Sequence, residues 1–179
     1  MHDEALRVLP EVLRSMKVEN PILVGHSDGA SIALIHAGGG HAVQGLVVMA
    51  PHVFIEPKCL ESIKEAKHRF ETTDLSSRLG RRHRDARKTF YGWADVWLDP
   101  RFIEWDIRAD YLPGVRCRVL AIQGYDDAYG TMAQLDEIRD RVRAFCRLVK
   151  LHNCGHHPFR ERPGRVLRES SAFIAELLQ

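Results

Sequence analysis

The sequence predicts an α/β protein in which a sheet of about four parallel strands is flanked by helices and interrupted by a helical insertion. Three observations predict this fold. Short runs are apolar throughout, as in parallel strands that are buried on both faces. Segments with apolar residues at helical spacing separate these runs. A long central block, which holds all three tryptophans, has helical spacing alone. Strands that alternate with helices favour a parallel sheet, and 179 residues with 45% hydrophobic content are enough to bury one core.

The elements are expected in the following order. The first helix covers residues 5–16, and Pro10 in its middle implies a kink or a restart. The strands are expected at residues 22–25 (ILVG), which form a continuous apolar run, and at 45–51 (GLVVMAP), 118–124 (RVLAIQG) and 147–151 (RLVKL). A buried helix at residues 30–37 is ended by three glycines, which suit a helix C-terminus. One further helix is marked by the apolar face Met132, Leu135, Ile138, Val142 and Phe145, and a closing helix by Val166, Phe173, Ile174 and Leu177.

The insertion is expected over residues 52–113, between the second and third strands, so that residues 1–51 and 114–179 form the core. Two helical stripes lie in it: Leu60, Ile63 and Phe70 form the first, and Ala86, Phe90, Trp93 and Trp97 form the second. A break at Asp99-Pro100 follows, and Phe102 and Trp105 come after it.

Composition and charge exclude several classes of protein. With 26 basic and 24 acidic residues the net charge is +2, which gives no global attraction to nucleic acid or to anionic membranes. The basic run at residues 78–88 has no interleaved aromatic residues and is interpreted as a solvated helix face. The glycines at 38–40 lack the Lys and Ser/Thr of a phosphate loop. No apolar run suits a signal peptide or a membrane span, and the four cysteines form no C-x-x-C pair, so a cytoplasmic protein with reduced thiols is expected.

One short motif carries the chemistry: Gly25-His26-Ser27-Asp28-Gly29 follows the first buried strand and precedes a buried helix. A nucleophilic serine has to stand exposed at the carboxyl end of a strand, on a tight turn, and flanking glycines are expected to prevent clashes there. The backbone N–H groups at the start of the following helix can hold an oxyanion. The alternative is that Ser27 merely caps a helix beside a glycine turn.

A serine nucleophile needs a base, and the base needs an acid that orients it. The third strand runs into Gly124-Tyr125-Asp126-Asp127, and the last strand runs into Gly155-His156-His157. The carboxyl ends of parallel strands lie at one edge of the sheet, where sites in open α/β sheets form. The serine, the carboxylates and the histidines are therefore expected to meet at that edge.

In these motifs and in their order the sequence resembles the α/β-hydrolase family, over essentially the whole chain. The resemblance implies that Ser27 is the nucleophile, Asp127 the acid and His156 the base, with the N–H of Asp28 as an oxyanion donor and His26 packed behind the site. Asp126 and His157 are the neighbours that could take the roles of the acid and the base.

The resemblance also implies a serine hydrolase that needs no metal or organic cofactor. A small or medium organic ester is the expected substrate, and the carbon-carbon bond hydrolases of the family are not separated from esterases by these residues. The insertion lies where the family places a helical cap. Its Trp93, Trp97, Phe102 and Trp105, together with His157, could shape a substrate pocket, or the aromatic residues could serve to attach the cap. A zinc site at Cys154, His156 and His157 is poorly supported, because no distant ligand pair accompanies this cluster.

One departure from the family is expected to matter. The family has further strands, and a loop that gives the second oxyanion donor, ahead of the helix in which this chain begins. The first strand would then be a sheet edge that could pair with a partner or with a second copy of the chain. The alternative function is accordingly an N-terminally truncated, inactive fragment that binds a partner.

Overall fold

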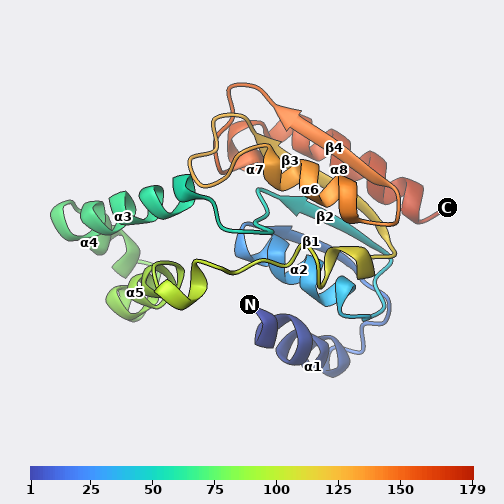
Figure 1. The fold of residues 1–179 in the computed structure, drawn as a ribbon, viewed down its shortest axis with the longest axis horizontal. Helices are drawn as coiled ribbons and strands as arrows, with labels where there is room; N and C mark the ends of the chain where they lie inside the picture. Colours follow the sequence, from blue (N-terminus) through green and yellow to red (C-terminus); the bar gives the residue numbers. More distant parts are fainter. The chain divides into compact units, whose positions relative to one another are not determined.

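The computed structural model describes residues 1–179 and contains one four-stranded sheet with the strand order β1-β2-β3-β4. The strands are β1 (Ile22–His26), β2 (Gly45–Met49), β3 (Arg118–Gly124) and β4 (Cys146–Leu151). Every neighbouring pair is parallel, so all four carboxyl ends lie at one edge of the sheet (Figure 1). The predicted α/β class and the predicted sheet of about four parallel strands are confirmed.

The contacts within the chain divide it into two compact units, which are described separately: Met1–Phe54 with Asp106–Gln179, and Ile55–Trp105. The sequence predicts the insertion over residues 52–113. The first unit holds the sheet and the helices α1 (Leu9–Ser15), α2 (Asp28–Gly38), α6 (Ala133–Arg141), α7 (Pro158–Glu161) and α8 (Pro163–Leu177). The second unit holds α3 (Pro57–Thr72), α4 (Leu75–Gly80) and α5 (Ala86–Trp97).

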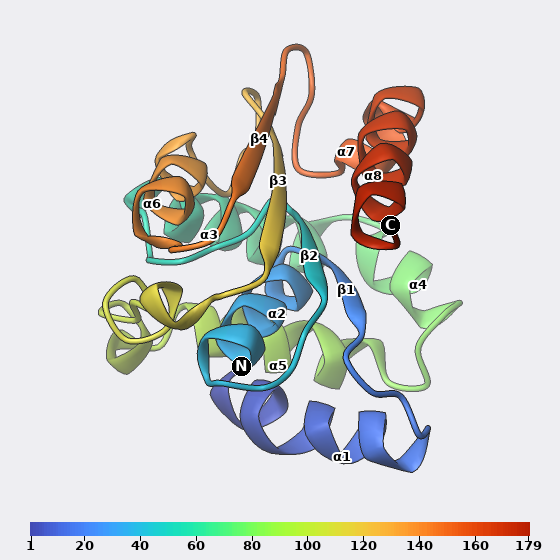
Figure 2. The ribbon, with the colours of Figure 1, turned by 90° about the vertical axis from the view of Figure 1, so that its right-hand side faces the viewer.

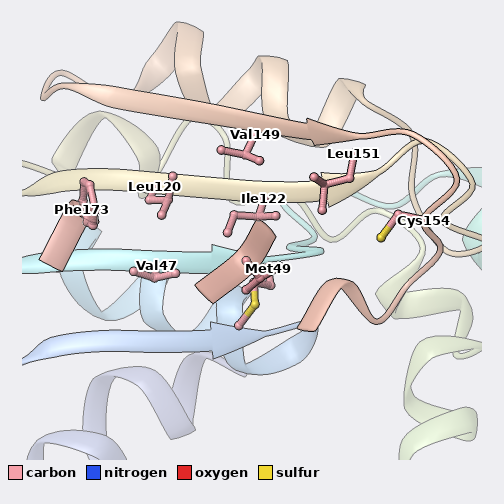
Figure 3. Packing of buried hydrophobic residues seen from close by; sticks show 9 residues of the cluster. Val47, Met49, Leu120, Ile122, Val149, Leu151, Cys154 and Phe173 are labelled. Atoms are coloured by element: carbon pink, nitrogen blue, oxygen red, sulfur yellow. The ribbon is translucent and has the colours of Figure 1, made fainter. Parts of the chain in front are cut away.

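Helices cover both faces of the sheet, which explains why the central strand β2 is apolar throughout. Helix α8 lies on one side of the strands, while α2 and α6 lie on the other (Figure 2). Alternate strand residues face α8, where Phe173 and Val166 complete a cluster with Val47, Met49, Leu120, Ile122, Val149, Leu151 and Cys154 (Figure 3). All five residues of β2 are buried, as expected for a central strand.

Strand β1 is an edge of this sheet. Its residues are less buried than those of β2, and the side chain of Val24 is 58% exposed. An exposed apolar strand edge presents unpaired backbone groups to a potential partner strand.

Two expectations about helices are refined. A π-helical turn over Glu4–Val8 precedes α1, and Pro10 lies in the first turn of α1, so the helix restarts there, where a missing N–H costs least. The prediction that Phe145 belongs to the helix face before β4 is wrong. Helix α6 ends at Arg141, the next residue is extended, and Phe145 is exposed beneath the Arg118 guanidinium. Residues 142 and 145 have helical spacing by chance, because they lie in the short loop between α6 and β4.

The unit Ile55–Trp105 has an aromatic core of its own. The rings of Phe70 and Phe90 stack with centroids 4.1 Å apart and join α3 to α5. The basic run at residues 78–88 is almost entirely exposed, as expected, but it is not one helix face. It covers the end of α4, a turn and the start of α5, where Asp85 caps the helix by accepting from the N–H of Lys88.

None of the helices in residues 1–179 combines the length and the apolar character needed to cross a membrane.

Candidate active site

Ser27 occupies a strained turn between β1 and α2. Its backbone has φ 54° and ψ −124°, a conformation that costs a residue with a Cβ about 1–3 kcal/mol. The surrounding backbone holds it there: the N–H of Ser27 donates to the carbonyl of Met49 at 2.9 Å, and the carbonyl of Ser27 accepts from Ala30 N–H at 2.9 Å. The turn thus raises the serine hydroxyl at the carboxyl end of the sheet, as a nucleophile elbow does.

The two glycines of the motif are not equivalent. A Cβ at Gly25 would clash with the Gly29 carbonyl oxygen and would lie 2.7 Å from the nitrogen of Ala30, so that α2 can approach β1 because residue 25 has no side chain. A Cβ at Gly29 would meet nothing within 4 Å, and Gly29 is not among the residues with positive φ. The expectation that both glycines prevent clashes therefore holds for Gly25 and is wrong for Gly29.

The turn after β3 and the loop after β4 are joined by close backbone contacts. A Cβ at Gly124 would clash with the carbonyl of Cys154 and would lie 2.6 Å from the carbonyl oxygen of Gly155. The N–H of Asp126 donates to the Cys154 carbonyl at 2.9 Å. This packing brings the segment that carries Asp127 against the segment that carries His156.

Ser27, His156 and Asp127 form a continuous chain of hydrogen bonds. His156 Nε2 lies 3.0 Å from Ser27 Oγ, and His156 Nδ1 lies 2.9 and 3.0 Å from the two carboxylate oxygens of Asp127. The side chain of Asp127 is 1% exposed and that of His156 is 11% exposed. The nearness that the resemblance implies is therefore present in the structure, with the serine and the carboxylate on opposite sides of one imidazole.

Electrostatics fix the direction of these bonds. Burial alone would raise the pKa of Asp127, but the hydrogen bond and charge of His156 and the N–H of Tyr129 outweigh burial, so the pKa is lowered and the group is a carboxylate. The Tyr129 N–H donates to Asp127 Oδ1 at 2.9 Å. Because a carboxylate only accepts, His156 Nδ1 carries a proton, and in the neutral imidazole Nε2 is then left to accept from the Ser27 hydroxyl. This is the tautomer that a general base needs.

The remaining residues of the motifs lie beside this chain of bonds. Asp126 and His157 are exposed. Neither of their side chains takes part in the hydrogen bonds that join Ser27, His156 and Asp127. His26 Nε2 donates to the backbone carbonyl of His156 at 2.7 Å, while burial lowers the pKa of His26 and keeps its ring neutral. Asp28 begins α2, where the first N–H groups have no acceptor within the helix.

The aromatic residues expected to shape a pocket belong to the unit Ile55–Trp105, where their rings contact other aromatic rings of the same unit. Trp97 is packed against Phe102, with ring centroids 5.3 Å apart, and Trp105 stacks on Phe102 at 5.5 Å. Trp93 meets Phe90 edge to face. Within this unit they form a core, and a role in substrate binding stays a prediction.

Two cavities, of about 400 and 520 Å³, lie elsewhere in the first unit. His41 and Ala42 line both, and no residue of the Ser27–His156–Asp127 chain lines either. Across residues 1–179 no group of three or more His, Cys, Asp and Glu side chains is placed to share a metal ion, and the Cys154 thiol is buried beside the Gly155 carbonyl.

Two features near the site were not anticipated from the sequence. The carboxylate of Glu161 accepts from the N–H groups on both sides of His156. His52, which is 3% exposed after β2, has its ring centroid 6.2 Å from that of His156. The contacts of Glu161 are local, four and six residues along the chain, whereas His52 reaches the site only through the tertiary fold.

Comparisons with known proteins agree with this fold. A structure of an alpha/beta fold family hydrolase from Bacillus anthracis str. Sterne matches with a TM-score of 0.70 and 15% identity, over 98% of this chain and 73% of that one. A lipase candidate from Acinetobacter baumannii AYE matches with a TM-score of 0.74 and 16% identity, over 95% and 66%. An esterase from Exiguobacterium antarcticum matches with a TM-score of 0.64 and 17% identity, over 96% and 72%.

At these identities the likeness shows a shared fold, and a search of curated protein sequences finds no significant match. The family model described as "Alpha/beta hydrolase family" matches residues 2–169, nearly the whole length. The chain therefore belongs to the alpha/beta hydrolase family.

Proposed function

We propose that this protein is a serine hydrolase that cleaves small or medium carboxylic esters with Ser27 as nucleophile, His156 as general base and Asp127 as the orienting acid. One observation carries the proposal: the unbroken path from Asp127 through His156 to Ser27, with every step at 2.9–3.0 Å. The strained backbone of Ser27 supports it, because strain of this kind persists where the surrounding structure imposes it and is concentrated at functional sites.

The reaction follows from the hydrogen bonds. As Ser27 Oγ attacks the ester carbonyl, its proton passes to His156 Nε2, and Asp127 stabilises the imidazolium that forms. The backbone N–H of Asp28, at the start of α2, donates to the oxyanion of the tetrahedral intermediate. His156 then gives its proton to the leaving alcohol. Water repeats the attack on the acyl-enzyme, again with His156 as base, and releases the acid and Ser27.

The test is covalent labelling of the purified 179-residue chain with a fluorophosphonate, followed by peptide mass spectrometry, alongside hydrolysis of p-nitrophenyl esters of increasing acyl length. We expect one label on Ser27 and measurable ester turnover, both lost in Ser27→Ala. Ser31, on the next turn of α2, gives the matched control: it is fully buried and bonded to the His52 carbonyl, and should take no label. A folded protein that takes no label at Ser27 and cleaves no ester would refute the proposal.

A further inference from the structure

The loop that carries His156 runs from the end of β4 to the start of α7 and needs external support. It contains Asn153 with φ 51°, and Gly155 and His156 belong to no helix or strand. A general base on such a loop must nevertheless stay within hydrogen-bond reach of the nucleophile, because a misplacement of about 1 Å can cost about 100-fold in rate.

One carboxylate holds the backbone on both sides of His156. Glu161, the last residue of α7, accepts from Gly155 N–H through Oε2 at 2.7 Å and from His157 N–H through Oε1 at 3.1 Å. These two amide donors lower the pKa of Glu161, so that it is charged at neutral pH. A Cβ atom added to Gly155 would lie 3.2 Å from both carboxylate oxygens of Glu161, which is closer than Cβ atoms normally lie to neighbouring atoms.

The third contact comes from the strand that carries the nucleophile. His26, the residue before Ser27, donates from Nε2 to the carbonyl of His156 at 2.7 Å, and the two rings lie 4.9 Å apart. The backbone of the base is therefore bonded to Glu161 through both flanking N–H groups and to His26 through its own carbonyl. The last of these bonds ties His156 directly to the residue next to Ser27.

We propose that Glu161 is a positioning residue, which together with His26 holds the backbone of His156 so that Nε2 faces the Ser27 hydroxyl. The inference rests on the proposed hydrolase function for its kinetic consequence, and on the hydrogen bonds for its structural one. Glu161 acts through His156. Its loss should lower kcat and leave KM nearly unchanged, because the number of competent His156–Ser27 pairs falls while the substrate contacts stay as they are.

Glu161→Gln is the decisive variant. Its side chain keeps the size of glutamate but has one acceptor oxygen, so that one of the two N–H groups faces an NH₂ group. We expect kcat to fall on the order of 10-fold, less than the loss for a full 1 Å misplacement. Glu169→Gln, on α8, is the matched control: it removes an equal charge from an ion pair with Arg165 and should stay within about twofold of the parent.

Two spectroscopic measurements separate positioning from simple stability. The His156 Nδ1–H proton, bonded to Asp127, should give a far-downfield ¹H NMR signal that broadens or shifts in Glu161→Gln and stays unchanged in Glu169→Gln. In the parent protein the amides of Gly155 and His157 should exchange with solvent much more slowly than the amides of exposed loops. Because the exchange measurement uses the parent protein, it tests the two hydrogen bonds to Glu161 even where the variant fails to fold.

The outcomes are distinguishable. A parent protein without esterase activity or labelling would overturn the proposed function, while the NMR signal and amide protection would still judge the role of Glu161. Unprotected amides at Gly155 and His157 in the parent would overturn the inference. So would a folded Glu161→Gln variant with the parental kcat and an unchanged His156 signal. His26→Phe, which retains a ring but loses the donor, should shift the same His156 signal, and an unchanged signal would contradict the part given to His26.

Discussion

Replacing Asp127 with asparagine would change one buried atom at the centre of the proposed site. The two carboxylate oxygens both lie within 3.0 Å of His156 Nδ1, and the side chain is 1% exposed. Tyr129 N–H already donates to Oδ1, so an asparagine there is held with its oxygen toward Tyr129. Its NH₂ group then faces His156 and donates to Nδ1, which forces the imidazole proton onto Nε2.

That tautomer points a proton at Ser27 where a lone pair is required. His156 can then no longer accept the hydroxyl proton, while the shape of the site stays nearly the same. The equivalent change in a serine protease triad lowers kcat about 10⁴-fold. A loss of this size corresponds to about 5.4 kcal/mol of transition-state stabilisation at about 1.36 kcal/mol for each factor of ten.

The assay is steady-state hydrolysis of p-nitrophenyl butyrate by the parent, Asp127→Asn and Asp126→Asn. Asp126→Asn is the matched control, because Asp126 is the adjacent residue, carries the same carboxyl group and is exposed. Its hydrogen bond to the Cys154 carbonyl comes from the backbone N–H, so the substitution leaves that bond in place. We expect Asp126→Asn to stay within about threefold of the parent. A large loss in Asp126→Asn with near-parental activity in Asp127→Asn would refute the assignment of the acid.

Two further predictions concern stability. Gly25→Ala should destabilise the fold and abolish labelling of Ser27, because its Cβ would lie 2.7 Å from the nitrogen of Ala30. In contrast Gly29→Ala, within α2 and in open space, should raise the free energy of unfolding by about 0.5–1 kcal/mol, and urea denaturation of both variants measures the difference. The lowered pKa of Asp127 means that its contribution to stability is complete above the ordinary value of 3.8 and is lost as the pH falls through the lower folded value. Urea unfolding from pH 6 to pH 3 should therefore show a steeper acid loss in the parent than in Asp127→Asn, and equal slopes would contradict this reasoning.

The fold was predictable because its signals are local. A central strand such as β2, with all five residues buried, is covered on both faces and has to be apolar at every position. The helices between strands were equally visible from spacing, and Pro10 marked a real change of helix. The same spacing misplaced Phe145, because a periodic pattern does not record where the chain stops making helical hydrogen bonds.

The candidate site was partly predictable for a related reason. Ser27, Asp127 and His156 each follow a strand, and parallel strands bring their carboxyl ends to one edge, so strand order alone predicts that the three segments meet. The choice between Asp126 and Asp127 could not be made in this way. Neighbouring residues in a turn point in different directions, and only the folded structure shows that Asp127 meets the imidazole while Asp126 is exposed.

By itself, the sequence determined the α/β class, the positions of the four strands and the order in which the serine, the carboxylates and the histidines follow those strands, because burial and turn chemistry act over a few neighbouring residues. The tertiary structure alone decided the tautomer of His156, the unequal importance of Gly25 and Gly29, and the hydrogen bond from His26 to the backbone carbonyl of His156. Each of these depends on a hydrogen bond or a close approach between segments that the fold brings together, and geometry of this kind leaves no pattern in the sequence.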